Sequence, residues 1–347
     1  MSELRYPSRH VCIVLLTGLG DVVHGLPLVN ALKDDDPARR ITWVVEPMPA
    51  PLLAGHPSID RVVVYRKKDG VRGVNQLRRD LRAGERIDLA LNLNVYTKSV
   101  WPTLLSRAPH RLGFDRGRSF EGVWLAANHH LDARPRAHTA DMFLEFAEHL
   151  GLPIPCPEWR ISFTEEEMAA QSAWREPFGG ERVATIVPAS AQAKKDWLPE
   201  RCAAVADALA RDFGYRVVLA GGPGAREQAI AREIVERASA PITWALGDGI
   251  RRLAWTIGAS DLLVAPDTGP VHIARALGVP VIGLYGHTNP WRVGPWRAWQ
   301  DLWIDRYTAP GEPPDPSDNR APLGRMERIT VDEVVEKVAL ATERYVR

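Results

Sequence analysis

The sequence is poor in cysteine and has no long apolar run. Its 347 residues include three cysteines, Cys12, Cys156 and Cys202, which are too few and too scattered for a disulfide framework or a cysteine-based zinc site. A reducing cytoplasm is the expected compartment. No segment approaches the roughly 20 apolar residues that span a bilayer, and the apolar run 11–16 is too short for a signal peptide. We therefore expect a soluble protein that contacts a membrane at most from its surface.

A net charge excess and the common nucleotide-binding fingerprints are also missing. The chain carries 44 Lys and Arg against 43 Asp and Glu, a net charge of +1, so nucleic-acid binding through bulk positive charge is not expected. Gly18 and Gly20 begin a G-x-G pattern, but Val23 stands at the third glycine position, and the glycine-rich residues 221–224 fail the same pattern. No P-loop sequence is present. These absences argue against a dehydrogenase and exclude a P-loop enzyme.

The chain does contain a regular alternation of short apolar runs and amphipathic stretches. Such β-α-β alternation is typical of parallel sheets with helices on both faces. The predicted fold class is therefore α/β, with two doubly wound Rossmann-like domains that face a cleft. The expected strands are 11–17, 41–46, 61–66 and 89–94, and then 183–187, 216–220, 242–246, 262–265 and 281–285.

A proline-rich stretch without a buried strand divides the two series. We expect a first domain at 1–155, a linker at 156–181, a second domain at 182–328 and a final helical segment at 329–347. Open sheets of this kind bind ligands at the carboxyl ends of their strands, so the loops that leave the strands are the candidate sites. The irregular stretch 286–325 is rich in Trp and Pro. Its tryptophans at 291, 296, 299 and 303 could contact a ligand, pack the hinge between the domains or meet the membrane, and packing is the favoured interpretation.

The first strand opens into a glycine-rich turn, Thr17-Gly18-Leu19-Gly20-Asp21. Two glycines allow the backbone to approach a ligand closely. Asp21 stands where a helix N-cap belongs, and a cap is one interpretation. The other is a general base that faces the cleft, because a carboxylate at a helix start stays ionised.

Two loops of the second domain carry groups suited to an anion. Asp267-Thr268-Gly269-Pro270 follows a strand and opens a helix, whose N–H groups would bind an anion without a metal. His272, in the first turn, would point back toward the same place. Asp267 or Thr268 could otherwise be only a cap. The loop after the strand at 183–187 contains Ser190, Lys194 and Lys195. These side chains would neutralise a diphosphate, or the loop could be only a solvated turn.

Charge is unevenly distributed along the chain. Residues 61–140 carry 16 Lys and Arg against 7 Asp and Glu, so the near-zero total hides a basic half of the first domain. A solvated face is the default interpretation. The alternative is an anionic partner or an anionic membrane surface.

At these loops the sequence resembles glycosyltransferase family 9, the ADP-heptose lipopolysaccharide heptosyltransferases. The segments that carry the resemblance are 20–27 (GDVVHGLP), 194–199 (KKDWLP) and Asp267-Thr268-Gly269 with His272. Residues 112–115 (LGFD) and His138 add to it, and the matches run in order over residues 10–290. The GDVVHGLP form is similar to heptosyltransferase I.

The resemblance implies a GT-B fold with the nucleotide sugar in the second domain, the acceptor in the first, and the final helix packed on the first. It implies an inverting transfer of heptose from ADP-heptose to a Kdo-containing lipopolysaccharide inner-core acceptor, without a metal or cofactor. Asp21 matches the general base of the family. The implied donor-binding residues are Ser190, Lys195, Glu227, Asp267, Thr268, Gly269 and His272, and the implied acceptor-side residues are Gly18, Gly20, Lys98 and Arg118. A cytoplasmic location, peripheral contact with the inner membrane surface and no nucleic-acid partner are also implied.

The sequence departs from the family pattern in three places and leaves alternatives open. Phe120-Glu121 stands where the family often has Arg-Glu, with Arg118 nearby, and 308–328 lacks the cysteines of many relatives. Pro188 stands where the donor loop of relatives is often more polar. One alternative is a family 9 enzyme that uses another nucleotide sugar or glycan acceptor. Others are a nucleotide-sugar epimerase of similar fold, which would need no basic acceptor side, and a non-catalytic binding module, which would not need both Asp21 and Lys195.

Overall fold

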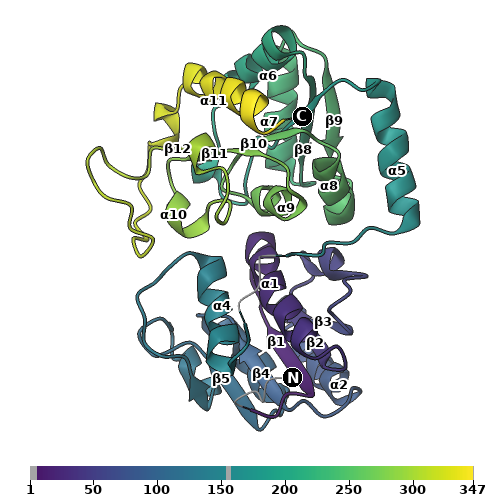
Figure 1. Ribbon diagram of the computed structural model, residues 1–347, viewed down its shortest axis with the longest axis vertical. Helices are drawn as coiled ribbons and strands as arrows, with labels where there is room; N and C mark the ends of the chain where they lie inside the picture. Colours follow the sequence, from purple (N-terminus) through teal and green to yellow (C-terminus); the bar gives the residue numbers. More distant parts are fainter. Residues whose placement is uncertain (1–5, 154–157, 347) are drawn as a thin grey trace. The chain divides into compact units, whose positions relative to one another are not determined.

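The chain forms two compact units, Met1–Ser162 and Phe163–Arg347. The computed structural model describes residues 6–153 and 158–346 (Figure 1). The division between the units falls inside the stretch 156–181 that the sequence suggests as a linker. Cys156 and the first residues of that stretch lie outside the described residues.

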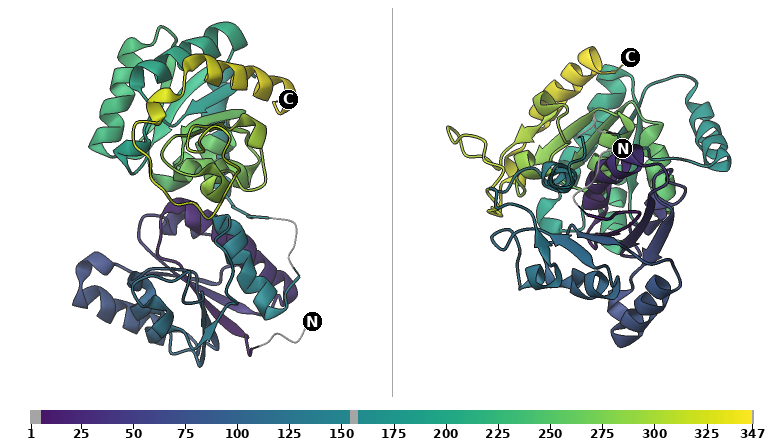
Figure 2. Two further views of the ribbon diagram at one scale, coloured as in Figure 1. Left: turned by 90° about the vertical axis from the view of Figure 1, so that its left-hand side faces the viewer. Right: turned by 60° about the horizontal axis from the view of Figure 1, so that its bottom comes forward.

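The first unit is a six-stranded parallel sheet with helices on both faces (Figure 2). Its strand order is β3-β2-β1-β4-β5-β6. The strands β1 and β4 are buried along their whole length, as expected for parallel strands covered on both faces. The strands are β1 (His10–Val14), β2 (Arg40–Val45), β3 (Arg61–Val64), β4 (Leu89–Asn92), β5 (His110–Gly113) and β6 (His129–His130). The helices are α1 (Leu19–Asp35), α2 (Val71–Arg82), α3 (Val100–Leu105) and α4 (Thr139–Leu150), with short 3₁₀ turns that include η3 (Thr97–Ser99) and η4 (Val123–Ala126).

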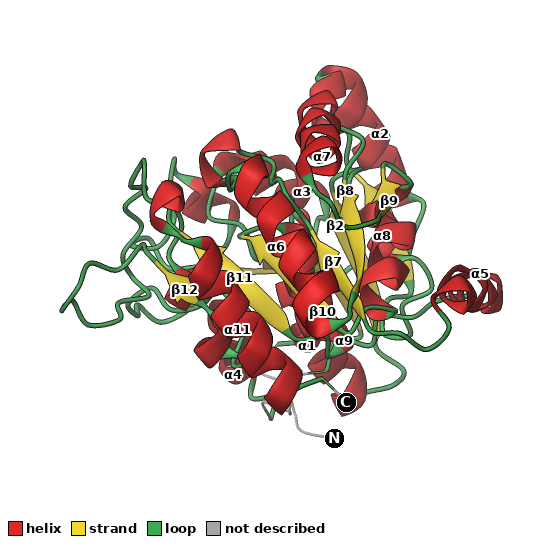
Figure 3. Cartoon of the chain, turned by 90° about the horizontal axis from the view of Figure 1, so that it is seen from above, coloured by secondary structure: helices red, strands yellow, loops and turns green. Residues whose placement is uncertain are grey.

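The second unit repeats this architecture with the order β12-β11-β10-β7-β8-β9. Figure 3 shows β11, β10, β7 and β8 side by side in that order. The strands are β7 (Val183–Ile186), β8 (Arg216–Gly221), β9 (Ile242–Leu246), β10 (Leu262–Pro266), β11 (Val281–Tyr285) and β12 (Ile304–Asp305). The helices are α5 (Glu165–Arg175), α6 (Pro199–Phe213), α7 (Ala225–Arg237), α8 (Gly249–Gly258), α9 (Gly269–Leu277), α10 (Pro290–Val293) and α11 (Val331–Arg344).

Both sheets therefore have the doubly wound order in which the chain starts at the centre, builds outward and then crosses to the other side. The crossing point lies between β1 and β4 in the first unit and between β7 and β10 in the second. Ligands bind in the crevice outside the carboxyl ends of the strands at such a switch point. The topology thus selects the loops after β1, β4, β7 and β10 as candidate sites.

The final helix differs from the expectation that it packs on the first domain. The helix α11 contacts α6 and β11 of the second unit, and Val334, Val338 and Ala341 are buried in that unit's core. The indole of Trp197 donates a hydrogen bond to the Ile329 carbonyl, 3.2 Å away, just before the helix. The apolar face of α11 is thus used within the second unit.

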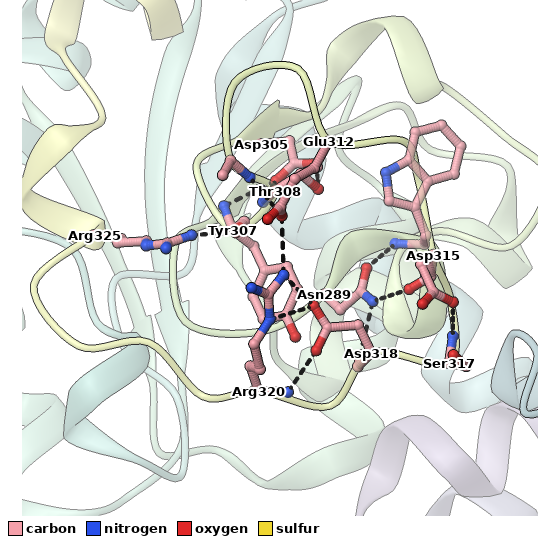
Figure 4. A network of polar contacts seen from close by, with 12 residues as sticks. Asn289, Asp305, Tyr307, Thr308, Glu312, Asp315, Ser317, Asp318, Arg320 and Arg325 are labelled. Atoms are coloured by element: carbon pink, nitrogen blue, oxygen red, sulfur yellow. Dashed lines mark hydrogen bonds and ion pairs between the residues drawn. The ribbon is translucent and has the colours of Figure 1, made fainter.

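Part of the Trp-rich stretch is packed within the second unit. Trp296 and Trp303 are buried, and the rings of Trp291 and Trp303 lie 5.5 Å apart. The segment that follows is ordered by polar contacts (Figure 4). In that network the Asn289 amide donates to the carbonyls of Asp315 and Asp318 at 2.8 and 2.9 Å. The segment has little regular structure because its own side chains satisfy its backbone.

Candidate active site

The switch point of the second sheet brings three of the predicted donor residues together. Lys195 Nζ lies 2.6 Å from Asp267 Oδ2, and His272 Nε2 lies 3.9 Å from Asp267 Oδ1. Lys195 follows β7, Asp267 follows β10 and His272 is in the first turn of α9. Asp267 is only 8% exposed, so this carboxylate is held between two basic side chains with little access to water.

The start of α9 adds a second source of positive potential. The helix begins at Gly269, and its N-cap Thr268 is extended and makes no side-chain cap hydrogen bond. The N–H groups of the first turn and the helix dipole favour an anion at this end. Asp267 precedes the cap, so the interpretation of Asp267 as a cap is wrong; its carboxylate pairs with Lys195 instead.

The loop after β7 is fixed by its own polar groups. The buried Ser190 donates from its backbone N–H to Asp196 Oδ1 at 2.8 Å, and from its hydroxyl to the Gln192 carbonyl at 2.8 Å. Arg226 pairs with Asp196 and donates to the Ser190 carbonyl. The Ser190 hydroxyl thus shapes its own loop, and sequence reasoning missed Asp196 and Arg226, although each is adjacent to a predicted site residue.

Glu227 lies at the start of α7 and occupies the glycine-rich turn after β8. Its Oε2 accepts a hydrogen bond of 2.5 Å from the N–H of Gly222. A Cβ at Gly222 would lie 2.7 Å from the same oxygen, so glycine is needed there for close approach. Its neighbour Arg226 donates a hydrogen bond to the Ser190 carbonyl, in the same loop that carries Lys195.

Tyr285, at the end of β11, is a further residue of this region that sequence reasoning missed. Burial raises its pKa well above the ordinary value, and the charges of Asp267 and Asp305 raise it further. The Tyr285 ring lies over Gly283, where a Cβ would clash with it. The only sequence signal for this role was an aromatic residue two positions after a glycine in the strand 281–285. The buried Tyr285 phenol therefore lies near enough to Asp267 for the two groups to interact electrostatically.

In the first unit, Asp21 lies in the first turn of α1 and is not the N-cap. The helix begins at Leu19, and its N-cap is Gly18, in an extended conformation. The cap interpretation of Asp21 is therefore wrong. Gly20 is the second helical residue. A Cβ added at Gly18 would have no atom within 4 Å. The packing of the first unit would therefore accept a larger residue at this position.

Lys98, in η3 after β4, lies close enough to Asp21 for their charges to interact. Burial lowers the pKa of Lys98, while the negative charges of Glu46 and Asp21 raise it. Glu46 Oε1 lies 3.7 Å from Lys98 Nζ and 2.7 Å from Lys67 Nζ. The switch point of the first sheet therefore brings a carboxylate at a helix start near a lysine.

Asn94 joins the two loops that carry these groups. Its Oδ1 accepts from the Leu16 N–H at 3.0 Å and its Nδ2 donates to the Val14 carbonyl at 2.8 Å. The buried amide thereby fixes the exit of β1 relative to that of β4. Sequence reasoning missed this role, and the only signal was a polar residue directly after a buried strand.

Arg118 is located in a buried ion-pair network and not in an open binding surface. It is 3% exposed, its Nε lies 2.5 Å from Asp115 Oδ2, and its Nη1 lies 2.7 Å from Glu145 Oε2. Its Nη2 donates to the Asp132 carbonyl at 2.9 Å. These partners use the guanidinium donors for structure, so Arg118 is not offered to an acceptor.

The two histidines of the family-like segments, His24 and His138, are packed together. His138 is the N-cap of α4, where its ring accepts a hydrogen bond from the Ala140 N–H. The ring of His24, one turn after Asp21, lies edge-on to His138 at 5.1 Å. This contact joins α1 to α4 beneath the first-unit site.

Among the described residues, no helix is long and apolar enough to cross a membrane, and no group of three or more His, Cys, Asp or Glu side chains could hold a metal ion.

Comparison with known proteins identifies the family. Residues 74–310 match the family model described as glycosyltransferase family 9 (heptosyltransferase). The lipopolysaccharide core heptosyltransferase OpsX of Haemophilus influenzae is 33% identical over 293 residues, which cover 83% of this chain and 82% of that protein.

Solved structures agree with this assignment. The family 9 glycosyltransferase of Veillonella parvula superposes with a TM-score of 0.74 at 26% identity, covering 85% of this chain and 84% of that one. The Escherichia coli heptosyltransferase WaaC with ADP has the same fold, with a TM-score of 0.73 at 22% identity over 97% of this chain and 99% of that one. The chain therefore belongs to glycosyltransferase family 9, and it is a glycosyltransferase with the predicted GT-B fold.

Proposed function

We propose that this enzyme transfers heptose from ADP-heptose to a Kdo-containing inner-core acceptor of lipopolysaccharide at the cytoplasmic face of the inner membrane. The 33% identical relative is a lipopolysaccharide core heptosyltransferase, which supports the sugar and the acceptor class. The observation that carries the proposal is the Lys195–Asp267–His272 cluster at the start of α9, because it supplies charge suited to a diphosphate.

The donor is proposed to bind to the second unit. The Lys195 ammonium and the first N–H groups of α9 would neutralise the diphosphate, and Asp267 would keep Lys195 directed toward the helix start. As the bond between the sugar and the diphosphate breaks, negative charge develops on the leaving ADP, and fixed positive groups stabilise that charge. Glu227 and the turn 221–224 are proposed to contact the ribose.

The acceptor is proposed to bind to the first unit. The Asp21 carboxylate would take the proton of the attacking hydroxyl, whose oxygen then bonds to the anomeric carbon from the side opposite to ADP. This single displacement inverts the configuration of the anomeric carbon. Lys98 is proposed to contact a carboxylate or phosphate of the acceptor. The open space beside Gly18 supports close approach of the acceptor to the start of α1.

The assignment of Asp21 is tested by Asp21→Asn. The amide cannot accept the proton, and a general base contributes about 10²–10⁴-fold, so transfer should fall by about that factor while ADP affinity stays near the wild-type value. Calorimetry with ADP and a transfer assay measure the two quantities. An Asp21→Asn enzyme with wild-type kcat would remove Asp21 from the mechanism.

The alternative is a family 9 enzyme with another nucleotide sugar or another glycan acceptor. Calorimetry with ADP-heptose, ADP, UDP and GDP separates the donors, and a preference for UDP or GDP would overturn the ADP-heptose assignment. The rate of transfer in the presence of EDTA should equal the rate without it. The reason is that a lysine and helix N–H groups, and not a metal ion, are proposed to neutralise the diphosphate.

A further inference from the structure

The first unit exposes a cluster of large apolar side chains that the transfer chemistry does not use. Tyr96, Trp101, Leu104 and Leu125 are 45%, 55%, 42% and 70% exposed. We call these four residues the α3 patch. Single exposed apolar side chains are normal, but a group of them marks an interaction site.

The members of the α3 patch come from two segments, 96–105 and η4, that are joined by packing and hydrogen bonds. The helix α3 contacts η4, and the ring of Tyr96 stacks on Phe120 at 5.3 Å. The Phe120 N–H donates to the Val95 carbonyl at 2.8 Å, and the Thr97 hydroxyl donates to Glu121 Oε2 at 2.7 Å. The patch is therefore one surface and not a set of scattered residues.

The helix α3 has apolar side chains on two faces. Leu105 is half-buried and packs against the core of the first unit, and Pro102 and Thr103 are buried. Trp101 and Leu104 are three positions apart and lie together on the exposed face. A surface helix ordinarily turns only its apolar face toward the core, so this second, exposed apolar face is suited to an apolar environment outside the chain.

The surroundings of the patch are basic. Arg107 and Arg116 are exposed, the Arg116 guanidinium lies 5.3 Å from the ring centre of Trp124, and that of Arg136 lies 4.5 Å from the ring centre of Phe120. The neighbouring helix α2, which contacts α3, exposes four more arginines: Arg72, Arg78, Arg79 and Arg82. The carboxylate of Glu121 is already bound by Thr97.

We propose that the α3 patch docks the first unit on an anionic lipid bilayer. Trp101, Leu104 and Leu125 would enter the headgroup region, where Trp and apolar side chains are favoured, and the arginines would face lipid phosphates. The inference deepens the proposed function, in which the acceptor is lipid-linked. Lys98, on the proposed acceptor side, is three residues before Trp101, so docking would bring the acceptor end of the first sheet to the bilayer.

Vesicle flotation tests the proposal directly. The vesicles contain phosphatidylglycerol and phosphatidylethanolamine, or phosphatidylcholine alone as the neutral comparison. The double variant Trp101→Ala/Leu125→Ser should bind anionic vesicles at least about tenfold more weakly than the wild type, since two apolar side chains no longer leave water. The wild type and its variants should bind neutral vesicles weakly, because a neutral membrane surface does not attract the arginines.

The matched control is Trp244→Ala/Leu323→Ser in the second unit, where Trp244 is 40% and Leu323 is 73% exposed. It removes the same side-chain types at similar exposure and should float like the wild type. The proposal is overturned if the wild type does not float, if the patch variant floats like the wild type, or if the control loses as much binding. It is also overturned if sedimentation velocity shows that the patch variant only dissociates a dimer.

A transfer assay separates this proposal from the proposed function. With a water-soluble acceptor that lacks acyl chains, the patch variant should keep the wild-type kcat/KM, and with acceptor embedded in anionic vesicles it should be slower. If the wild type transfers heptose to neither acceptor, the proposed function fails. The flotation result still decides whether the α3 patch binds membranes.

Discussion

At the residue scale, Lys195 and Asp267 show how a site is built from one carboxylate and its basic neighbours. The 2.6 Å contact between them positions the ammonium before any donor arrives. A preformed positive group stabilises developing charge without reorganisation during the reaction. The same pairing leaves Asp267 as an uncompensated negative charge if Lys195 is removed.

Lys195→Ala is therefore expected to weaken ADP binding by about 1.5–3 kcal/mol, the range for a hydrogen bond to a charged group. The matched control is Lys194→Ala, because Lys194 belongs to the same 3₁₀ turn and is exposed. It should leave the dissociation constant near the wild-type value. Calorimetry with ADP measures both variants, and equal affinities would show that Lys195 does not hold the diphosphate.

Arg118 is expected to act on stability and not on acceptor affinity. Removing one member of a buried ion pair costs about 3–5 kcal/mol, because the partner charge stays buried. Arg118→Ala should lower the free energy of unfolding of the first unit by about that amount, as measured by urea denaturation. Arg134→Ala, which removes an exposed pair with Glu148, should change it little. A folded, equally stable Arg118→Ala enzyme with a raised acceptor KM would restore Arg118 as an acceptor contact.

At the element scale, α5 shows that a stretch expected to be a linker carries a docked helix. Thr164 and Glu167 form a capping box at its start. Gln171 Nε2 donates to the Trp255 carbonyl of α8 at 2.6 Å, and Glu167 pairs with Arg251, also of α8. Both contacts are more than 80 residues apart in the sequence, so the local proline content could not predict them.

The pairing of Glu167 predicts an acid sensitivity. Arg251 is the largest cause that lowers the pKa of Glu167, to about 2. A carboxylate with a depressed folded pKa adds stability above its unfolded pKa of about 4.3, and that stability is lost as the pH falls toward 2. Glu167→Gln should lower the stability of the second unit at pH 7 and flatten its decline between about pH 4.5 and pH 2.

Urea denaturation across that pH range is the measurement, and Glu166→Gln is the control. Glu166 is exposed in the same turn and should leave the pH profile unchanged. A Glu167→Gln protein with the wild-type profile would mean that α5 contributes nothing to the second unit through this pair.

At the scale of the whole molecule, two sheets with the same strand order are proposed to bind the two substrates of one reaction. Each unit has its own core and its own switch point. The second unit carries the groups suited to a nucleotide diphosphate, and the first carries the carboxylate, the basic surface and the α3 patch. A near-zero net charge thus hides a basic first unit, whose residues 61–140 hold 16 Lys and Arg against 7 Asp and Glu.

ADP is accordingly expected to stabilise the second unit more than the first. A ligand that binds only the folded state at about 100 times its dissociation constant adds about 2.7 kcal/mol. Amide hydrogen exchange should show this protection in β7, β8, β10 and β11, and Lys195→Ala should reduce it at the same ADP concentration. If ADP protected only amides of the first unit, the nucleotide site would have to be assigned to that unit.

The sequence by itself determined the α/β class, most strands and the loops that carry the site, because hydrophobic periodicity and turn residues are local signals. The strands 242–246 and 281–285 occur with the predicted bounds. It missed β5, whose polar residues His110 and Arg111 break the apolar run. For α11 the family resemblance implied packing on the first domain, but its apolar face is buried in the second unit's core.

Only the tertiary structure decided which polar and apolar groups have partners inside the chain. Asp21 and Arg118 are both charged residues near loop glycines, and the sequence treats them alike. The fold leaves Asp21 in the first turn of α1 near Lys98 and buries Arg118 between Asp115 and Glu145. The sequence also did not indicate that the side chains of Trp101 and Leu104 would be exposed. Burial and pairing depend on residues far apart in the chain, which no local pattern records.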